Sequence, residues 1–332
     1  MRLTPLAFLL FSSGAFAGNY WTAIEELQFS KLADTFSDKK VSVLLEGYGK
    51  NLSKKEKSAV AVLITLGALD AENLAREEIA EKKVRSYVKT VFDSNPSLMG
   101  RIGDVSLFHH MAGAFEHSDL LSDHFFLRSL GEGLIDGVIT GFDLRSKGVF
   151  DKFPLSQTFI YSHSSLLHIR QLVVLLHSEG IDGWIYITPK LSSFLYRDGW
   201  ESAPGTAITL ANGERVVQGK EIAVLFHFDS SYDQKRFHEV VSQFAKKNTK
   251  DEAGLIENAW WQPFYYTSQA FEDFEPISLV VVSGKDHEAT LTTLEKNAEK
   301  VAETFNDDRW AVRTDRVWVN PPFFRFLNGG YK

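Results

Sequence analysis

Three histidines that recur at every seventh position are the first candidates for chemistry in this sequence. They are His110, His117 and His124. On a single helix this spacing rotates each imidazole by only about 20° but moves it about 10.5 Å along the axis. Zinc holds imidazole nitrogens at about 2.0–2.1 Å, and zinc-binding pairs on a helix stand four residues apart. The spacing therefore predicts histidines at the border of an apolar helix face and no metal site.

Other catalytic signatures are incomplete. His238 and His287 each begin an H-E-x-x sequence, but neither has the second histidine one turn later that a zinc peptidase needs. The chain contains no G-x-S-x-G elbow and no phosphate-binding P-loop sequence. Gly133, Gly137 and Gly141 loosely follow a dinucleotide-binding turn, but their spacing of four is explained by a helix that presents a small face to a neighbour. We therefore expect no cofactor.

Three residues remain as candidates for acid–base catalysis: His163, His227 and Asp229. His227 and Asp229 flank the end of an apolar strand expected over 222–228, and His163 stands near the start of a helix that can pack beside it. A histidine and a carboxylate in contact can act as a general acid and base. The structural alternative makes His227 a neutral, hydrogen-bonded core residue and Asp229 the N-cap of the following helix. We favour the structural alternative.

An aromatic cluster is the main candidate for binding. Seven aromatic residues fall within 260–274, and we select Trp260, Trp261, Tyr265 and Tyr266 as the binding candidates. A strand there would place aromatic rings on both of its faces. One face can fill the core, while the other meets solvent, a ligand or a neighbouring domain, and exposed rings favour protein partners and sugars. Packing against a helical domain is the equal alternative.

The predicted secondary structure changes near residue 150. Before this point the pattern is helical. Ser53 and Glu56 have the S-x-x-E spacing of a capping box, and apolar residues recur at helical intervals over 74–91. We predict a helical domain over 18–150.

Strand and helix signals alternate in the following stretch, 151–220. A strand is expected at 183–188, and a hairpin is expected around Asn212-Gly213, a pair typical of two-residue β turns. We interpret this stretch as an α/β connecting region.

A pattern that repeats at a spacing of 55 residues defines the last predicted domain. An apolar strand, a polar turn and an amphipathic helix start at Glu221 and again at Pro276, and an aromatic stretch follows each copy. Strand, helix, strand taken twice is the plan of a ferredoxin-like βαββαβ module, in which two helices cover one face of an antiparallel sheet. We predict this module over 221–332, with 222–228 and 277–283 as adjacent central strands, and an α+β fold class.

Residues 1–17 have the layout of a secretory signal peptide. Arg2 precedes an apolar run, and the segment ends in the A-x-A pattern of Ala15 and Ala17. The run is shorter than the roughly 20 residues of a membrane-spanning helix. We therefore predict an exported chain that starts at Gly18, is periplasmic or secreted, and has no transmembrane anchor.

Composition and charge narrow the possible partners. The chain is 44% hydrophobic and 24% charged, which is an ordinary globular profile, and it has no cysteine, so it folds without disulfides. Its formal net charge of −7 becomes −8 when Arg2 is removed with the signal peptide. Nucleic acid is excluded as a partner because phosphate binding draws on clustered positive charge.

Two function classes fit these observations. The preferred one is an exported, non-catalytic protein that binds a protein partner or a small ligand in the cell envelope, through its aromatic cluster. The alternative is an exported hydrolase that uses histidine and aspartate residues for acid–base catalysis. A deep site with converging polar groups favours the hydrolase, whereas a flat aromatic surface favours the binding protein.

Overall fold

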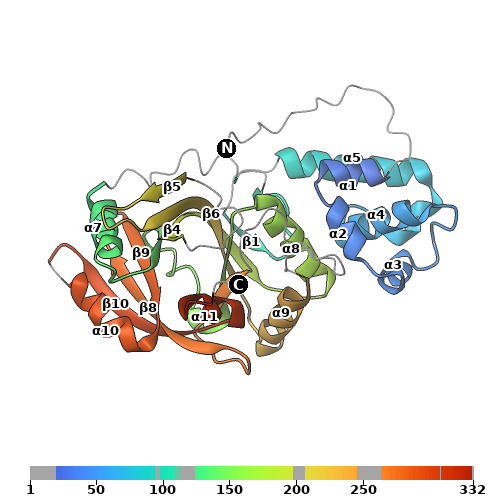
Figure 1. The fold of residues 1–332 in the computed structure, drawn as a ribbon. Coiled ribbons are helices and arrows are strands. Elements are labelled where there is room, and N and C mark those ends of the chain that lie inside the picture. Colours follow the sequence, from blue (N-terminus) through green and yellow to red (C-terminus); the bar gives the residue numbers. More distant parts are fainter. Residues whose placement is uncertain are drawn as a thin grey trace.

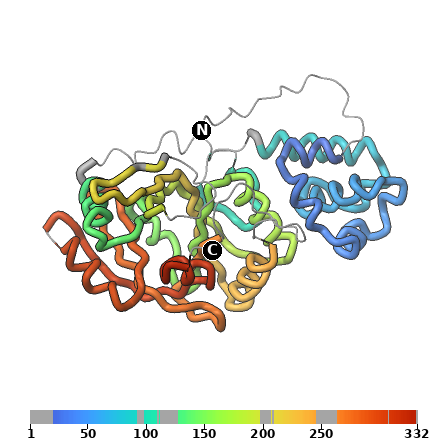
Figure 2. Tube along the Cα trace, in the orientation of Figure 1, coloured from blue at the N-terminus to red at the C-terminus, as the bar shows by residue number. Residues whose placement is uncertain are grey.

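An antiparallel β-barrel carries helices on its outer surface, and a group of short helices from the N-terminal part of the chain packs to one side of it (Figure 1). The computed structural model describes residues 20–93, 98–108, 111, 124–196, 206–244, 263–306 and 308–330. The trace in Figure 2 follows the chain from these N-terminal helices, through the barrel, to its C-terminal end beside the barrel.

The described helices and strands have the following bounds. The α-helices are α1 (Tyr20–Glu26), α2 (Ser30–Thr35), α3 (Asp38–Leu45), α4 (Lys54–Thr65), α5 (Glu77–Asp93), α7 (His124–Ile135), α8 (Leu166–Ser178), α9 (Ser231–Phe244), α10 (Ala298–Thr304) and α11 (Pro321–Leu327). Short 3₁₀ helices are η1 (Ala71–Ala75), η2 (Leu155–Gln157) and η3 (Glu295–Asn297). The strands are β1 (Met99–Arg101), β2 (Gly141–Ser146), β3 (Thr158–His163), β4 (Trp184–Leu195), β5 (Thr206–Thr209), β6 (Arg215–His227), β7 (Phe264–Thr267), β8 (Glu275–Ser283), β9 (His287–Thr293) and β10 (Ala311–Val319).

The predicted capping box is present at the start of α4. The Glu56 backbone N–H donates to the Ser53 hydroxyl, and the Ser53 N–H donates to the Glu56 carboxylate. These two bonds satisfy amide groups that the first turn of a helix leaves without partners. The apolar residues that follow, such as Val60 and Leu63, are fully buried.

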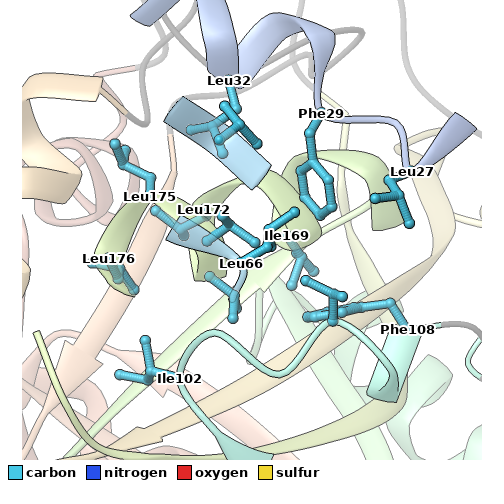
Figure 3. Packing of buried hydrophobic residues seen from close by; sticks show 14 of the residues in the cluster. Leu27, Phe29, Leu32, Leu66, Ile102, Phe108, Ile169, Leu172, Leu175 and Leu176 are labelled. Atoms are coloured by element: carbon cyan, nitrogen blue, oxygen red, sulfur yellow. The ribbon is translucent and has the colours of Figure 1, made fainter. Parts of the chain in front are cut away.

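The N-terminal helices share a core with α8. Leu27, Phe29 and Leu32 belong to one buried cluster with Ile169 and Leu172 of α8, and Figure 3 shows these side chains gathered between the two parts. Fully burying an apolar side chain of this size contributes about 1.5–3 kcal/mol. The helices over 20–93 are therefore packed onto the barrel side of the molecule rather than joined to it by a linker alone.

The barrel closes through eight of the ten described strands. Going round the ring, the order is β4, β2, β9, β8, β10, β7, β3 and β6, and β6 then pairs with β4. Every neighbouring pair is antiparallel. The two remaining strands extend the sheet outside the ring, β1 on β4 and β5 on β6.

Alternation along β4 decides which side chains face the inside of the barrel. Ile185 and Ile187 pack with α8 and α9 in the outer core, and Leu191 packs with α7 and α10 in a second outer core. Successive side chains of a strand point to opposite faces. Lys190 and Ser192 therefore point into the barrel.

The barrel interior has an apolar part and a polar part. The apolar part is a buried cluster from β3, β6, β7, β8 and β10, with side chains added by the turn after β2 and by α11: Val149, Phe150, Ile160, Leu225, Tyr266, Ile277, Leu279, Val281, Val317, Val319 and Phe323. The polar part lies on β2, β4, β6 and β9. An eight-stranded barrel has an interior that side chains just fill, or that holds one small ligand.

The predicted ferredoxin-like module over 221–332 is wrong. Strands 222–228 and 277–283 are not adjacent, because β6 pairs with β3, β4 and β5 whereas β8 pairs with β9 and β10. The α+β arrangement predicted from them is replaced by the closed barrel.

The second copy of the repeated pattern accounts for the error. The segment 287–293, expected to start a helix, is strand β9, and α10 begins only at Ala298. Ala289 and Leu291 face the outer core while Thr290 lies inside the barrel, which is the period of a strand. Its β-branched threonines favour this conformation.

The helical expectation for 18–150 holds over the described residues 20–93, but the later part of that range contributes strands to the sheet. β1 pairs with β4, and β2 pairs with β4 and β9. The domain boundaries at 17, 150 and 220 stay predictions. None of the helices in the described ranges combines the length and the apolarity that a membrane crossing needs.

Candidate functional site

The three acid–base candidates do not form one site. Thr158 is opposite His227 in the pairing of β3 with β6, and His163 is opposite Ile222. Five residues of a strand span about 17 Å. His163 and His227 therefore stand at opposite ends of this strand pair, and Asp229 lies just beyond the end that carries His227.

His163 is buried at the start of α8. Its Nδ1 accepts a hydrogen bond of 2.9 Å from the Ser165 backbone N–H, and its ring lies 4.1 Å from the His168 ring, centroid to centroid. Burial, followed by the neighbouring His168, holds the pKa of His163 well below its usual value. A neutral His163 that accepts from the backbone has a structural role in the turn before α8.

His227 lies at one end of the barrel. The Thr158 hydroxyl donates to the Pro154 carbonyl oxygen at 2.7 Å, so its oxygen accepts from His227 Nδ1 at 3.3 Å. The His227 ring also stacks on Phe153, with 4.7 Å between centroids. This tautomer leaves Nε2 facing Asp229, at 3.7 Å from its carboxylate.

Asp229 does not cap the following helix. The Ser230 hydroxyl accepts from the Asp233 backbone N–H at 3.0 Å, which makes Ser230 the capping residue of α9. The Asp229 side chain is exposed and lies 3.7 Å from His227 Nε2.

The aromatic candidates divide between two faces of β7. Trp260 and Trp261 lie outside the described residues. Tyr265 packs among Phe159 and other rings on the outer face, and Tyr266 belongs to the cluster inside the barrel. Both tyrosine rings are buried, so neither forms an exposed aromatic surface.

The densest group of buried charged side chains lies inside the barrel, in a row across four strands. Arg145 of β2 is opposite Glu288 of β9, and Lys190 of β4 is opposite Glu221 of β6. Because Leu144 pairs with Leu191, Arg145 and Lys190 are also at the same level. The row therefore runs Glu288, Arg145, Lys190, Glu221.

Asp143 and Ser192, two residues further along their strands, complete the network. Lys190 Nζ lies 3.0 Å from Asp143 Oδ1 and 3.0 Å from Glu221 Oε2. Ser192 Oγ lies 2.6 Å from Glu221 Oε2 and 2.9 Å from Asp143 Oδ1. One ammonium and one hydroxyl thus serve both carboxylates.

Arg145 is the least satisfied member of this network. Its side chain is 0% exposed, its Nη2 donates to Thr290 Oγ1 at 3.0 Å, and the same nitrogen is 3.5 Å from Asp143 Oδ2. Nε and Nη1 have no hydrogen-bond partner among the residues that the structure describes. Buried polar groups in folded proteins are almost always hydrogen-bonded, and an unpaired buried charge is costly.

Other polar atoms of the interior are also left without hydrogen bonds. Within the described ranges, Glu221 Oε1 and Glu288 Oε1 have no partner. Burial raises the pKa of both glutamates and of Tyr266, so their neutral forms are favoured relative to exposed groups. Arg145 faces Tyr266 electrostatically from the opposite wall and lowers its pKa in part.

The turn over 147–153 covers Arg145. The Phe150 ring lies with its centroid 4.8 Å from the Arg145 guanidinium carbon and 5.9 Å from that of Arg313. The turn is tied to the β8–β9 connection, because the Lys147 backbone N–H and ammonium donate to carbonyl oxygens of that connection. The turn therefore covers the charged row, and it is held there by Lys147 and by the buried side chains of Val149 and Phe150.

A second group of polar residues lies outside the barrel, between α9 and the loop before β8. His238 Nε2 is 3.1 Å from Asp273 Oδ1, so Nε2 carries the proton and Nδ1 is the acceptor. The Tyr265 hydroxyl donates to Nδ1 at 2.8 Å, and the exposed Ser242 Oγ is 3.4 Å from the same nitrogen. Ser242, His238 and Asp273 thus have the order of a nucleophile, its base and the group that orients the base.

Neither the charged row in the barrel nor the group around His238 could be recognised as a site from the sequence. The signal for the barrel row was the alternation in 141–146, where Phe142 and Leu144 are apolar and Asp143 and Arg145 are charged. A period of two indicates a strand, whereas the helical domain predicted over 18–150 includes this segment. For His238, the sequence offers only an incomplete zinc-peptidase signature.

No metal site is formed by histidine and acidic side chains within the described ranges. His110 and His117 lie outside them, and His124 begins α7. No protein-family model, curated protein or solved structure matches the chain.

Proposed function

We propose that this protein binds a small ligand that carries an oxyanion, such as a carboxylate, inside the barrel, and that Arg145 holds the anion. The observation that carries the proposal is the fully buried Arg145 guanidinium with two N–H-bearing nitrogens that lack partners in the described structure. Arginine presents its donors in a planar fork that matches a carboxylate in a bidentate pair.

The energetics argue against a purely structural role for Arg145. Buried charges cost several kcal/mol of desolvation each, and replacing a buried ion pair by apolar residues is often neutral or stabilising. A buried charge whose donors are only partly used is therefore a candidate for a binding site. Its neighbours on the row, Lys190 and Glu221, already satisfy each other at 3.0 Å.

Binding requires the turn over 147–153 to move. The Phe150 ring lies beside the Arg145 guanidinium, 4.8 Å from its carbon, and fills space that a ligand at Arg145 would need. The polar attachments of the turn to the β8–β9 connection are those of Lys147, and Val149 and Phe150 pack into the apolar cluster, so a local opening has to withdraw these two side chains while the strands stay paired. The ligand would then replace the Phe150 ring beside Arg145.

The place of action that we propose is the cell envelope. The support is the signal-peptide pattern of residues 1–17, which lie outside the described structure. A binding protein there meets small anions from the medium. We propose no nucleic-acid partner, since the net charge is −7.

Titration calorimetry of the purified protein with acetate, and separately with inorganic phosphate, tests the proposal. We expect saturable binding of acetate that is lost in Arg145→Met, a substitution that keeps the length of the side chain and removes its donors. Arg128→Met is the matched control, because Arg128 is exposed on α7 and pairs with Glu132 away from the row. Equal binding by both variants, or no binding by the unmodified protein, would overturn the proposal.

A hydrolase is the second candidate, and the group of Asp273, His238 and Ser242 favours it. For Ser242 to act as a nucleophile, the Tyr265 hydroxyl must first turn away from His238 Nδ1, which it occupies at 2.8 Å. Ser242 Oγ would then attack an ester carbonyl carbon and pass its proton to His238, and the ester C–O bond would break as His238 returns the proton to the departing alcohol, leaving an acyl-enzyme that water hydrolyses. A fluorophosphonate reagent should label Ser242 and should fail to label it in His238→Ala; labelling of neither form rules out this candidate.

A further inference from the structure

We propose that the anion enters the barrel together with one proton, which Glu288 takes up from solvent. This inference rests on the proposed binding function and adds a regulation to it: binding strengthens as the pH falls. The proton joins a carboxylate oxygen of Glu288, and no covalent bond of the ligand is made or broken.

The row already holds more carboxyl groups than cations, so a further anion is electrostatically unfavourable. Two cations, Arg145 and Lys190, face three carboxyl groups, those of Asp143, Glu221 and Glu288. Lys190 is shared by Asp143 and Glu221, both at 3.0 Å. A ligand anion would add a fourth acidic group to this row, inside a site where charges are poorly screened.

Glu288 is the carboxyl group whose charge compensation by Arg145 the ligand changes most directly. It is opposite Arg145 in the pairing of β9 with β2, so a ligand that engages Arg145 competes with Glu288 for the same cation. Glu288 is only 3% exposed, and its Oε1 has no hydrogen-bond partner in the described part of the chain. Protonation removes the repulsion and gives the carboxyl group a donor.

Charged and titratable groups face Glu288 from several elements, and the Tyr266 hydroxyl of β7 is one of them. Arg145 from β2, Arg313 from β10 and Lys147 from the covering turn favour its ionised form, and Asp151 from the same turn opposes it. Burial is the largest influence and already raises the pKa of Glu288 in the closed protein. A ligand bound to Arg145 weakens the stabilisation that Arg145 gives to ionised Glu288, so the pKa of Glu288 rises further.

Calorimetry with acetate in two buffers of different ionisation enthalpy, Hepes and Tris, at one pH near neutrality measures the proton directly. A proton taken from the buffer adds the buffer's ionisation enthalpy to the observed heat. We expect a dependence equal to about one proton per acetate bound, and an affinity that rises up to about tenfold for each pH unit lowered while Glu288 is ionised in the free protein.

The variant Glu288→Gln should still bind acetate, with the buffer dependence near zero. Glu295→Gln is its control, because Glu295 is half-exposed and pairs with Arg316 away from the row. If the unmodified protein binds acetate with no buffer dependence, the proposed proton uptake is refuted and the binding function is retained. Absence of acetate binding would overturn both. The buffer comparison needs no variant, so poor folding of Glu288→Gln does not affect it.

Discussion

Asp143 and Glu221 come from strands that do not pair with each other, yet both carboxylates are held by the same Lys190 ammonium at 3.0 Å. The link exists because β4, which carries Lys190, pairs with β2 on one side and with β6 on the other. Ser192 bridges the same two carboxylates one step along β4. The charges of three neighbouring strands thus act as one group.

Replacement of Lys190 by Met should destabilise the protein strongly. It leaves Asp143 and Glu221 in the barrel without their shared cation, and breaking a buried ion pair from one side costs about 3–5 kcal/mol. Lys54→Met is the comparison, since the Lys54 pair with Asp38 is exposed and such pairs contribute about 0–1 kcal/mol. Urea unfolding of both variants measures the difference, and equal losses would show that the Lys190 pairs are not what holds these carboxylates.

Replacement of Phe150 by Ala should separate stability from binding. Loss of a buried Phe side chain costs about 3–5 kcal/mol, but it also uncovers Arg145, so acetate should bind more tightly and faster. Phe305→Ala removes a ring of similar burial from the outer core. It should cost similar stability without changing acetate affinity. A parallel change in both variants would mean that Phe150 does not cover the site.

Acid should weaken the fold through His163. Its pKa is lowered by burial in the folded protein, whereas in the unfolded chain it is near 6.5. Between these two values the unfolded state binds more protons, so the contribution of His163 is complete above about pH 6.5 and is lost as the pH falls.

Thermal unfolding across pH 5–8 tests this contribution. The stability of His163→Gln should fall less between pH 7 and pH 5 than that of the unmodified protein. Glu221 and Glu288 work in the opposite direction, because their pKa values are raised and their contribution is lost as the pH rises. The difference between the two proteins, rather than either curve alone, therefore reports His163. Parallel curves would contradict the assignment.

Export should remove residues 1–17. N-terminal sequencing of the protein recovered from outside the cytoplasm is expected to start at Gly18, because Ala15 and Ala17 occupy the positions of an A-x-A cleavage site. An exported form that retains Met1 would contradict the signal-peptide interpretation. Substitution of Ala17 by a bulky residue such as Phe should block cleavage.

Local features of this fold could be predicted from the sequence. The capping box of Ser53 and Glu56 is present, and the hairpin at Asn212-Gly213 joins β5 to β6 with Gly213 at a φ of +85°. Both depend on residues close together in the chain, whose side-chain and backbone preferences decide the local structure.

The barrel could not be predicted in this way, because its closure depends on partners far apart in the chain. Arg145 of β2 is opposite Glu288 of β9, and no local pattern in either segment indicates the other. A buried charge also looks like a solvent-facing one in sequence, since both alternate with apolar residues. The candidate site therefore became visible only when the register placed Arg145, Lys190 and the carboxylates side by side.

The long pairing of β4 with β6 has a consequence for how the molecule opens. Its register runs without interruption from Trp184 and His227 to Leu195 and Val216. One end of this ladder lies under α8 and α9, and the other lies under α7. The amide hydrogens of β4 and β6 should then be the slowest to exchange with deuterium, and loss of either end should propagate to the other as one cooperative unit.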